Sequence, residues 1–165
     1  MDESKKARGH FFRRVLSSLL LLPAWFGFHK SIRVFFHRMR GVKIGKNVEI
    51  GYFCIIGNVH PYNIFIEDDV VVTAGCVLLD HDNSSYYAHG GEVVLGEVHI
   101  KRRAFVGLKS IIMPGVTIGE ASIVAPLSFV NKDVLPFTLV GGIPAKFIKA
   151  YDDRASKRDS LCEIT

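Results

Sequence analysis

The sequence predicts an all-β core folded as a parallel β-helix, in which short strands and corners wind into a triangular prism. The first observation is a period of six, because every sixth residue from Ile100 to Val130 is aliphatic. An α-helix repeats about every 3.6 residues and a strand about every two, so neither explains this period. Hexapeptide repeats are typical of a parallel β-helix. The aliphatic positions are Ile100, Val106, Ile112, Ile118, Val124 and Val130.

The second observation is a small or β-branched residue four positions after each aliphatic, and the third is a glycine directly after several of them. Three flat faces that close on one axis leave a narrow interior, which one large aliphatic per face fills. A small residue then fits beside each corner, where we expect glycine because it accepts positive φ. The small positions are Ala104, Ser110, Val116, Ser122, Ser128 and Val134, and Gly107 and Gly119 follow aliphatics.

The same repeat is present upstream in two interrupted sets, Ile44–Ile50–Ile56 and Ile66–Val72–Leu78. Four groups of three hexads predict four coils, stacked about 4.8 Å apart. The spacing from Ile44 to Ile66 exceeds one eighteen-residue coil by four residues, and that from Ile66 to Ile100 exceeds it by sixteen. We therefore expect a short insertion near residues 59–63 and a protruding loop at about 83–99, and such excursions often carry function.

The N-terminal segment, residues 1–41, predicts two basic amphipathic helices that flank Pro23. Their apolar faces fit either a lipid interface, reached through residues 11–40, or the protein's own body or a neighbouring subunit. The uncharged run 15–28 is shorter than the roughly 20 residues of a membrane-spanning helix, and no signal-peptide cleavage site follows it. The first face comprises Phe11, Phe12, Val15, Leu16, Leu19 and Leu20, and the second Trp25, Phe28, Ile32, Phe35 and Met39.

The predicted organisation has three parts: the helical segment 1–41, the β-helix 42–135 and an exit segment 136–165. Proline and glycine at Pro136, Gly141, Gly142 and Pro144 indicate that the regular repeat ends after Val134. We expect a short C-terminal helix within residues 145–151, followed by a polar tail.

Charge and cysteine content restrict the function classes. The net charge of +5 is uneven, because residues 1–47 hold eleven Lys/Arg and two acids, whereas residues 48–165 hold ten and fourteen. The predicted folded body is therefore acidic, which argues against nucleic-acid binding. Three cysteines without framework spacing indicate a reducing, cytoplasmic location. Of these, Cys54 and Cys76 occupy small positions and are predicted core residues.

His81 is the main catalytic candidate, since it lies between Asp80 and Asp82 where the long insertion begins. A neutral imidazole can take a proton from a hydroxyl, and a carboxylate can fix its tautomer. The alternative is a solvated turn without function. His60, His81, His89 and His99 lack the usual zinc spacings, so we expect no metal. No nucleotide-binding or nucleophile motif is present. Lys132, Lys146 and Lys149 could meet phosphates or be ordinary surface lysines.

These motifs together resemble the hexapeptide-repeat acyltransferases. The residues that carry the resemblance are the Ile-Gly hexads, Leu79-Asp80-His81-Asp82, Phe105-Val106-Gly107, the run Pro114 to Gly119, Val130-Asn131-Lys132-Asp133 and the run Gly141 to Lys146. Over about residues 41–150 the chain is most similar to the sugar O-acetyltransferases. These include the galactoside and maltose acetyltransferases and enzymes that modify bacterial surface polysaccharides.

The resemblance implies a left-handed β-helix that assembles as a homotrimer with active sites between adjacent prisms. His81 would be the general base in direct transfer from acetyl-CoA to a sugar hydroxyl, without a metal. The implied coenzyme contacts are Gly107, Leu108, Ala125, Asn131, Lys132, Lys146 and Lys149, and the implied acceptor side comprises Asp80, Asp82, Tyr86 and Phe105.

The sequence departs from the resemblance in three places: the basic apolar N-terminus, the insertion at residues 60–63 and Leu108, where relatives often have a polar residue. Three alternatives stay open beside sugar O-acetylation, which we expect in surface polysaccharide or glycan biosynthesis. They are N-acetylation of a nucleotide-linked amino sugar, a zinc-dependent carbonic anhydrase on the same prism, and a non-catalytic scaffold that docks on membranes.

Overall fold

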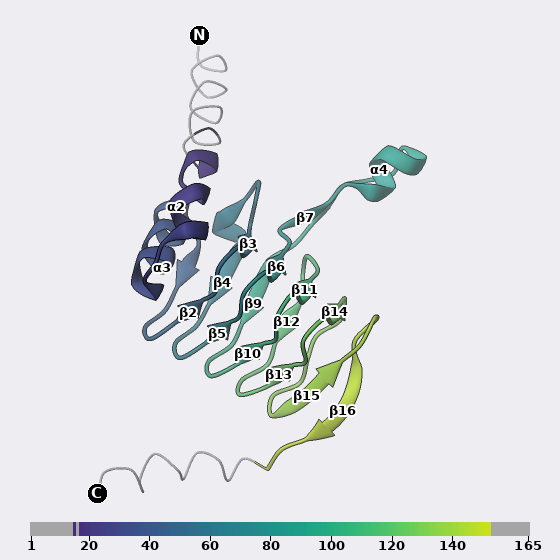
Figure 1. Cartoon of the computed structure of the whole chain (residues 1–165). Coiled ribbons are helices and arrows are strands. Elements are labelled where there is room, and N and C mark those ends of the chain that lie inside the picture. Colours follow the sequence, from purple (N-terminus) through teal and green to yellow (C-terminus); the bar gives the residue numbers. More distant parts are fainter. Residues whose placement is uncertain (1–14, 16, 153–165) are drawn as a thin grey trace, which may run out of the picture.

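Three sheets, parallel except for the last strand of one of them, form the faces of a triangular prism in the computed structural model, which describes residues 15 and 17–152 (Figure 1). Each coil of the chain adds one strand to face A, then face B, then face C. Face A contains β1 (Lys43–Ile44), β4 (Ile64–Ile66), β9 (Val98–Ile100) and β12 (Thr117–Ile118). Face B contains β2 (Glu49–Ile50), β5 (Val71–Val72), β10 (Phe105–Val106), β13 (Ile123–Val124), β15 (Thr138–Gly141) and β16 (Lys146–Ala150). Face C contains β3 (Ile55–Ile56), β6 (Val77–Leu78), β11 (Ile111–Ile112) and β14 (Phe129–Val130).

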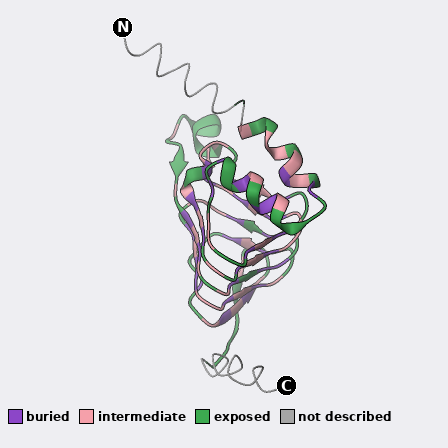
Figure 2. Ribbon diagram, turned by 90° about the vertical axis from the view of Figure 1, so that its left-hand side faces the viewer, coloured by how far each residue is buried: buried purple, intermediate pink, exposed green. Residues whose placement is uncertain are grey.

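The hexad register is confirmed at every coil. On face A, Ile44 pairs with Ile66, Ile66 with Ile100 and Ile100 with Ile118, and the other two faces repeat the pattern. The aliphatic side chains are buried along the prism axis, except that Ile44 in the first coil is only partly covered (Figure 2). The core is therefore one continuous column with a large aliphatic from each face.

The small positions are also buried, and three of them are serines whose hydroxyls are satisfied. Ser110 and Ser128 both donate to the carbonyl of Ala125, at 3.0 and 2.7 Å, and Ser122 donates to that of Gly119. Buried hydroxyls without partners would destabilise the core. These hydrogen bonds allow serine to fill the same small position that Cys54 and Cys76 fill in earlier coils.

The expected reason for the corner glycines is wrong at most sites. Gly45, Gly51, Gly107 and Gly119 have no positive φ. A Cβ atom at Gly51 would instead lie 2.3 Å from the backbone nitrogen of Ala74 in the next coil, and the other three are equally crowded. Close backbone approach therefore demands glycine directly after the aliphatic. The left-handed residue comes two positions later in the hexad, where Asn47, Phe53, Asp69, Arg103, Lys109, Ala121 and Leu127 adopt it.

The C-terminal part differs from the expectation in two ways. The predicted short helix in residues 145–151 is wrong, because Lys146–Ala150 forms β16, which pairs antiparallel with β15. The repeat also continues past Val134, since Val140 pairs with Val124 inside the prism. This spacing is sixteen residues, two short of a full coil, so counting in sixes misses it. The polar tail after residue 152 lies outside the described residues.

Two helices cover the opposite end of the stack: α2 (Leu21–Phe26) and α3 (Lys30–Met39). Pro23 lies in the first turn of α2, a position that its fixed φ allows. The predicted second face is broken, because Gly27 has an extended backbone and separates Trp25 from the rest. Residue 15 and residues 17–19 are helical, whereas Phe11, Phe12 and Leu16 of the first predicted face lie outside the described residues.

Three arginines from this region cap the exposed end of the first coil. In later coils, the carbonyls of Ile66, Val72 and Leu78 accept hydrogen bonds from the coil before. The equivalent carbonyls of the first coil have no such donor, so guanidinium groups take its place, one for each face. Arg38 donates to Ile44 on face A, Arg33 to Ile50 on face B and Arg40 to Ile56 on face C.

The helices therefore attach through polar groups and leave apolar side chains outside. Arg33, Val34 and His37 are the buried residues of α3, and the indole N–H of Trp25 donates to the carbonyl of Cys54 at 2.8 Å. The exposed apolar residues of this end, called here the apolar cap, are Leu19, Leu22, Phe26, Phe28, Phe35 and Met39.

Candidate active site

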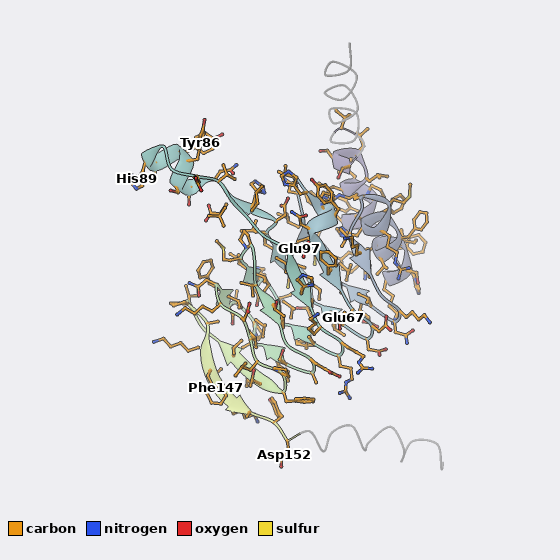
Figure 3. All side chains as sticks on the ribbon, turned by 180° about the vertical axis from the view of Figure 1, so that it is seen from behind. Glu67, Tyr86, His89, Glu97, Phe147 and Asp152 are labelled. Carbon is orange, nitrogen blue, oxygen red and sulfur yellow. The ribbon has the colours of Figure 1, made fainter. Side chains whose placement is uncertain are left out.

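The candidate site lies at the edge between faces C and A. After β6 the chain leaves this edge as β7 (His81–Asp82), continues through α4 (Ser84–His89) and returns as β8 (Val94–Leu95), which pairs antiparallel with β7. This arm projects from the side of the prism and carries Tyr86 and His89 at its far end (Figure 3). One coil earlier, the short insertion with the 3-10 helix Pro61–Asn63 leaves the same edge, and His60 precedes it.

Asp80 connects the two excursions. Its carboxylate is fully buried, and its Oδ1 lies 3.0 Å from Nδ1 of His81. Its Oδ2 accepts the backbone N–H of His60 and lies 3.2 Å from Nδ1 of the His60 ring. That ring nitrogen is buried, and its orientation falls short of a hydrogen bond with any described residue. A single carboxylate therefore lies between two imidazoles from neighbouring coils.

The ionisation of Asp80 fixes the tautomer of His81. Burial by itself raises the pKa of Asp80, but the hydrogen bond from His81 and the backbone N–H of His60 lower it by more, so the net pKa falls below its ordinary value. Asp80 is thus an anion at neutral pH and can only accept hydrogen bonds. Nδ1 of His81 must carry the proton that it donates, which leaves Nε2 with a free lone pair.

His81 can reach a substrate, since 20% of its side chain is exposed. Its Nε2 is a base held in one orientation by a buried carboxylate, which is the arrangement that general-base catalysis requires. The arm beside it is more open. Asp82 accepts the backbone N–H of Ser84 at 2.8 Å, and this bond lowers its pKa. Tyr86 is 55% exposed and packs edge-on against Tyr87.

Burial changes the interpretation of Asp80. We expected it on the acceptor side, but its side chain has no exposed surface. Its position behind His81 favours a supporting role over direct contact with a substrate.

Three of the seven predicted coenzyme residues lie at a different edge. Gly107 and Leu108 follow β10, and Ala125 follows β13, so all three are at the corner between faces B and C. Phe105 is on face B itself and is 37% exposed. Face C separates this edge from His81 within one chain, so the chain alone does not bring the two groups together.

The other four predicted coenzyme residues are divided between the C–A edge and the end of face B. Asn131 and Lys132 are exposed and follow β14, at the same C–A edge as His81 but two coils further along. Two coil steps correspond to about 10 Å. Lys146 and Lys149 lie on β16 at the end of face B, and Nζ of Lys149 is 4.5 Å from the centre of the Tyr151 ring.

His60 is the site residue whose role the sequence did not predict. It is one of the four histidines considered as zinc ligands, and its one other signal in the sequence is that it stands four residues after Ile56, where the repeat predicts a small residue. Within residues 17–152 no group of three His, Cys, Asp or Glu side chains is placed to hold a metal ion. His99 is on face A, where it stacks on Phe65 with ring centres 4.5 Å apart.

Comparison with known proteins gives the same fold. No family model matches the chain. A Staphylococcus aureus (strain Mu50) protein with an acetyltransferase name is 32% identical over 112 residues, which are 68% of this chain and 56% of that protein. The galactoside O-acetyltransferase of Escherichia coli K12 is 28% identical over 73% of this chain and 60% of its own length. The chain spans a little over half the length of these curated relatives.

Solved structures extend the likeness over most of the chain. A hexapeptide-repeat acetyltransferase from Vibrio cholerae has a TM-score of 0.74 at 24% identity and covers 88% of this chain and 94% of its own. A galactoside acetyltransferase in complex with coenzyme A has a TM-score of 0.64 at 19% identity, with 90% and 85% covered. AntD, an N-acyltransferase from Bacillus cereus, has a TM-score of 0.59 at 23% identity. The match covers 74% of this chain and 80% of that one. The chain therefore has the hexapeptide-repeat acetyltransferase fold, and the two curated relatives are named as acetyltransferases.

Proposed function

We propose that this protein transfers an acetyl group from acetyl-CoA to a sugar hydroxyl, in surface polysaccharide or glycan biosynthesis, with His81 as the general base. The observation that carries this proposal is the pairing of His81 with the buried carboxylate of Asp80 at the root of an exposed arm. The names of the curated relatives and the coenzyme A complex of one structural neighbour support the choice of donor.

The reaction needs no covalent enzyme intermediate. Nε2 of His81 takes the hydroxyl proton while the hydroxyl oxygen attacks the thioester carbonyl. The carbon–sulfur bond then breaks, and the coenzyme thiolate takes the proton back from His81. The products are an acetyl ester and free coenzyme A. Asp80 remains an anion and stabilises the imidazolium that forms between these steps.

Isothermal titration with acetyl-CoA tests the proposal first, with zinc assayed in the same sample. We expect saturable binding by zinc-free protein. For His81→Ala we expect the same affinity and at least a hundred-fold loss of turnover, the scale of a missing general base. His89→Ala, which changes an exposed histidine on the arm, is the matched control. Unchanged turnover in His81→Ala would remove the assigned base, and absent binding with stoichiometric zinc would favour the anhydrase alternative.

N-acylation of an amino sugar is the second candidate, since AntD was solved with dTDP-4-amino-4,6-dideoxyglucose and coenzyme A. The structure favours a hydroxyl acceptor because His81 has a buried carboxylate partner, and a neutral amine needs a base less than a hydroxyl does. Competition between amino sugars and neutral sugars, followed by mass spectrometry of the product, separates the two.

We propose that the active form is a homotrimer, in which a neighbouring chain supplies the B–C edge to each His81. The outward residues of faces B and C support this. They are mainly apolar, whereas those of face A are mainly polar or charged. Face B presents Glu49, Val71, Phe105, Ile123 and Leu139, face C presents Ile55, Val77, Ile111 and Phe129, and face A presents Lys43, Phe65, His99 and Thr117.

We also propose that the apolar cap docks on an anionic membrane surface at the cytoplasmic face. Phe28 is 85% exposed, and residues 1–47 carry an excess of nine positive charges. Apolar side chains beside basic ones are typical of an interfacial helix. No helix among the described residues is long and apolar enough to span a membrane.

Co-sedimentation with vesicles tests this docking. Deleting residues 1–41 would also remove the arginines that cap the first coil, so substitutions on the outer surface are the sharper change. We expect Phe28→Glu, Phe35→Glu and Met39→Glu together to weaken binding to phosphatidylserine vesicles at least tenfold, since each buried aromatic contributes about 2 kcal/mol. Leu135→Glu, at a side chain that is 72% exposed elsewhere, is the control. Equal sedimentation of both proteins would refute the docking surface.

A further inference from the structure

We propose that His60 and His81 together form a binding site for two neighbouring hydroxyls, so that the acceptor is a vicinal diol and His60 selects it. This inference rests on the proposed acetyl transfer and adds the substrate class and a second acceptor-binding residue. It comes from the placement of both imidazoles on one buried carboxylate.

The two rings approach different oxygens of the same carboxylate. Nδ1 of His81 is 3.0 Å from Oδ1 of Asp80, and Nδ1 of His60 is 3.2 Å from Oδ2. The ring centres are 6.3 Å apart, and the ring planes are nearly perpendicular, at 85°. The second His60 contact is an edge-on approach to the Tyr62 ring, with centres 5.6 Å apart. A small rotation of the His60 ring would align its Nδ1 with the carboxylate.

This placement decides where the protons lie. An ionised carboxylate accepts hydrogen bonds, so each neutral imidazole carries its proton on Nδ1, the nitrogen that approaches Asp80. Each Nε2 is on the far side of its ring from Nδ1 and presents a lone pair. The side chains are 30% and 20% exposed for His60 and His81, so both are partly accessible, whereas Asp80 is not.

Two partly exposed imidazoles whose ring centres lie 6.3 Å apart can each accept a hydrogen bond from an acceptor that carries two O–H donors. His81 takes the proton of the hydroxyl that attacks the thioester. His60 accepts a hydrogen bond from the adjacent hydroxyl, keeps its own proton on Nδ1 and stays neutral throughout, so it does not change the balance of the transfer step. An acceptor without the second hydroxyl leaves Nε2 of His60 without a partner, and this lowers its rate.

The position of His60 in the chain is consistent with a dedicated role. It replaces the small core residue that the hexad pattern places there, and the following Pro61 and the 3-10 helix carry the chain outside the prism. Its backbone N–H also bonds to Asp80, so the main chain as well as the side chain faces the carboxylate. The first insertion therefore brings a second imidazole to the base of the arm.

The test measures selectivity between matched sugars. Wild-type protein is supplied with acetyl-CoA and the methyl glycosides of galactose, glucose, mannose and N-acetylglucosamine, and NMR identifies the acetylated carbon. If a ring carbon is acetylated, that acceptor is compared with its analogue that lacks the hydroxyl on the neighbouring carbon, whereas acetylation at C6, whose neighbour C5 carries no hydroxyl, would overturn the diol site. We expect kcat/KM to fall about tenfold for the deoxy analogue with the wild-type protein, which corresponds to one lost hydrogen bond.

The same pair of sugars is then given to His60→Asn. The asparagine amide can donate to Asp80 from about the position of Nδ1, but it has no atom at the position of Nε2. We expect this variant to lose the tenfold discrimination while it acetylates the deoxy sugar at the wild-type rate. His60→Phe, which keeps a ring against Tyr62, serves as the second variant if the first fails to fold, and His89→Asn is the matched control.

The outcomes separate this inference from the proposed function. If the wild-type protein acetylates none of the glycosides, the proposed sugar acceptor fails and the diol site fails with it. If the wild-type protein acetylates them and His60→Asn discriminates as the wild type does, only the diol site is overturned. An equal loss of rate on both sugars would give His60 a role in positioning Asp80 instead and would also overturn the proposal.

Discussion

Asp80 is the residue on which the candidate chemistry depends, because it is the one charge buried between two excursions from the prism. The hydrogen bonds from His81 and from the backbone N–H of His60 lower its pKa despite burial. Asp80 is therefore ionised at neutral pH and accepts hydrogen bonds from both residues. The sequence pointed to His81 between two adjacent carboxylates, but it left open which one orients the ring and assigned Asp80 to the acceptor side. It could not predict His60, twenty residues earlier, because that contact exists only after two insertions leave the same edge.

His37 provides a test of buried charge at the residue scale. It is fully buried beside Arg40, and desolvation first and the guanidinium charge second lower its pKa to about 3. The unfolded chain binds the proton at an ordinary pKa of about 6.5, so stability is lost as the pH falls from about 6.5 towards 3. The contribution of Asp80 is lost only at lower pH, below its unfolded value.

We expect His37→Asn to reduce this acid sensitivity. Asparagine can still accept the hydrogen bond from Arg40, but it does not titrate. Between pH 7.5 and pH 5, the free energy of unfolding of the wild type should fall by about 2 kcal/mol more than that of the variant. Urea unfolding at both pH values measures the difference. Equal losses in the two proteins would show that His37 is not the group that binds the proton.

At the scale of elements, the interior was predictable and the ends were not. Hexad counting identifies the strands because each contributes the same aliphatic to the same column. The apolar face of α3 was expected to pack either on lipid or on the protein's own body, and the structure instead buries Arg33, Val34 and His37 against the prism. The reason is that the end of the prism presents carbonyl groups, which need donors. The strand β16 was missed because its partner β15 is outside the regular count.

The corner glycines give a prediction for the strands and corners. In Gly51→Ala, the new Cβ would lie 2.3 Å from a backbone nitrogen of the next coil, so a coil must shift. We expect a loss of about 3 kcal/mol, the upper range for overpacking. Gly90→Ala has open space but a φ of 67°, so its cost should be about 1 kcal/mol, from backbone strain alone. Thermal unfolding measures both, and a larger loss at Gly90 would contradict the close-approach argument.

At the scale of the whole molecule, one prism holds the parts of a site on different edges. The base His81 is at the C–A edge, whereas Leu108 and Ala125 are at the B–C edge, with face C between them. The sequence pattern places each residue on its edge, but it cannot show which edge of another copy meets it. That information depends on the outward side chains of faces B and C.

Mixed oligomers test the division of the site between chains. We expect His81→Ala and Ala125→Trp to be inactive separately, since one lacks the base and the other blocks the proposed coenzyme edge. If each site combines two chains, an equal mixture of the two variants that is unfolded and refolded together should regain about a quarter of wild-type activity. About a quarter of the sites would then combine an intact His81 from one chain with an intact Ala125 from its neighbour. Mixing without refolding is the control. No recovery, with trimers present by ultracentrifugation, would locate the whole site in one chain.

The arginines beneath the apolar cap also limit how far the prism can grow. A coil whose carbonyls are uncovered is a template for another coil, and identical prisms stacked end to end would form a fibre. Arg33, Arg38 and Arg40 occupy one such carbonyl on each face, so no foreign strand can pair there without displacing a guanidinium group. At the other end of face B, the antiparallel strand β16 occupies the edge of β15. The length of this column is thus set by the residues that end it, and a chain with those three arginines replaced would become prone to polymerisation.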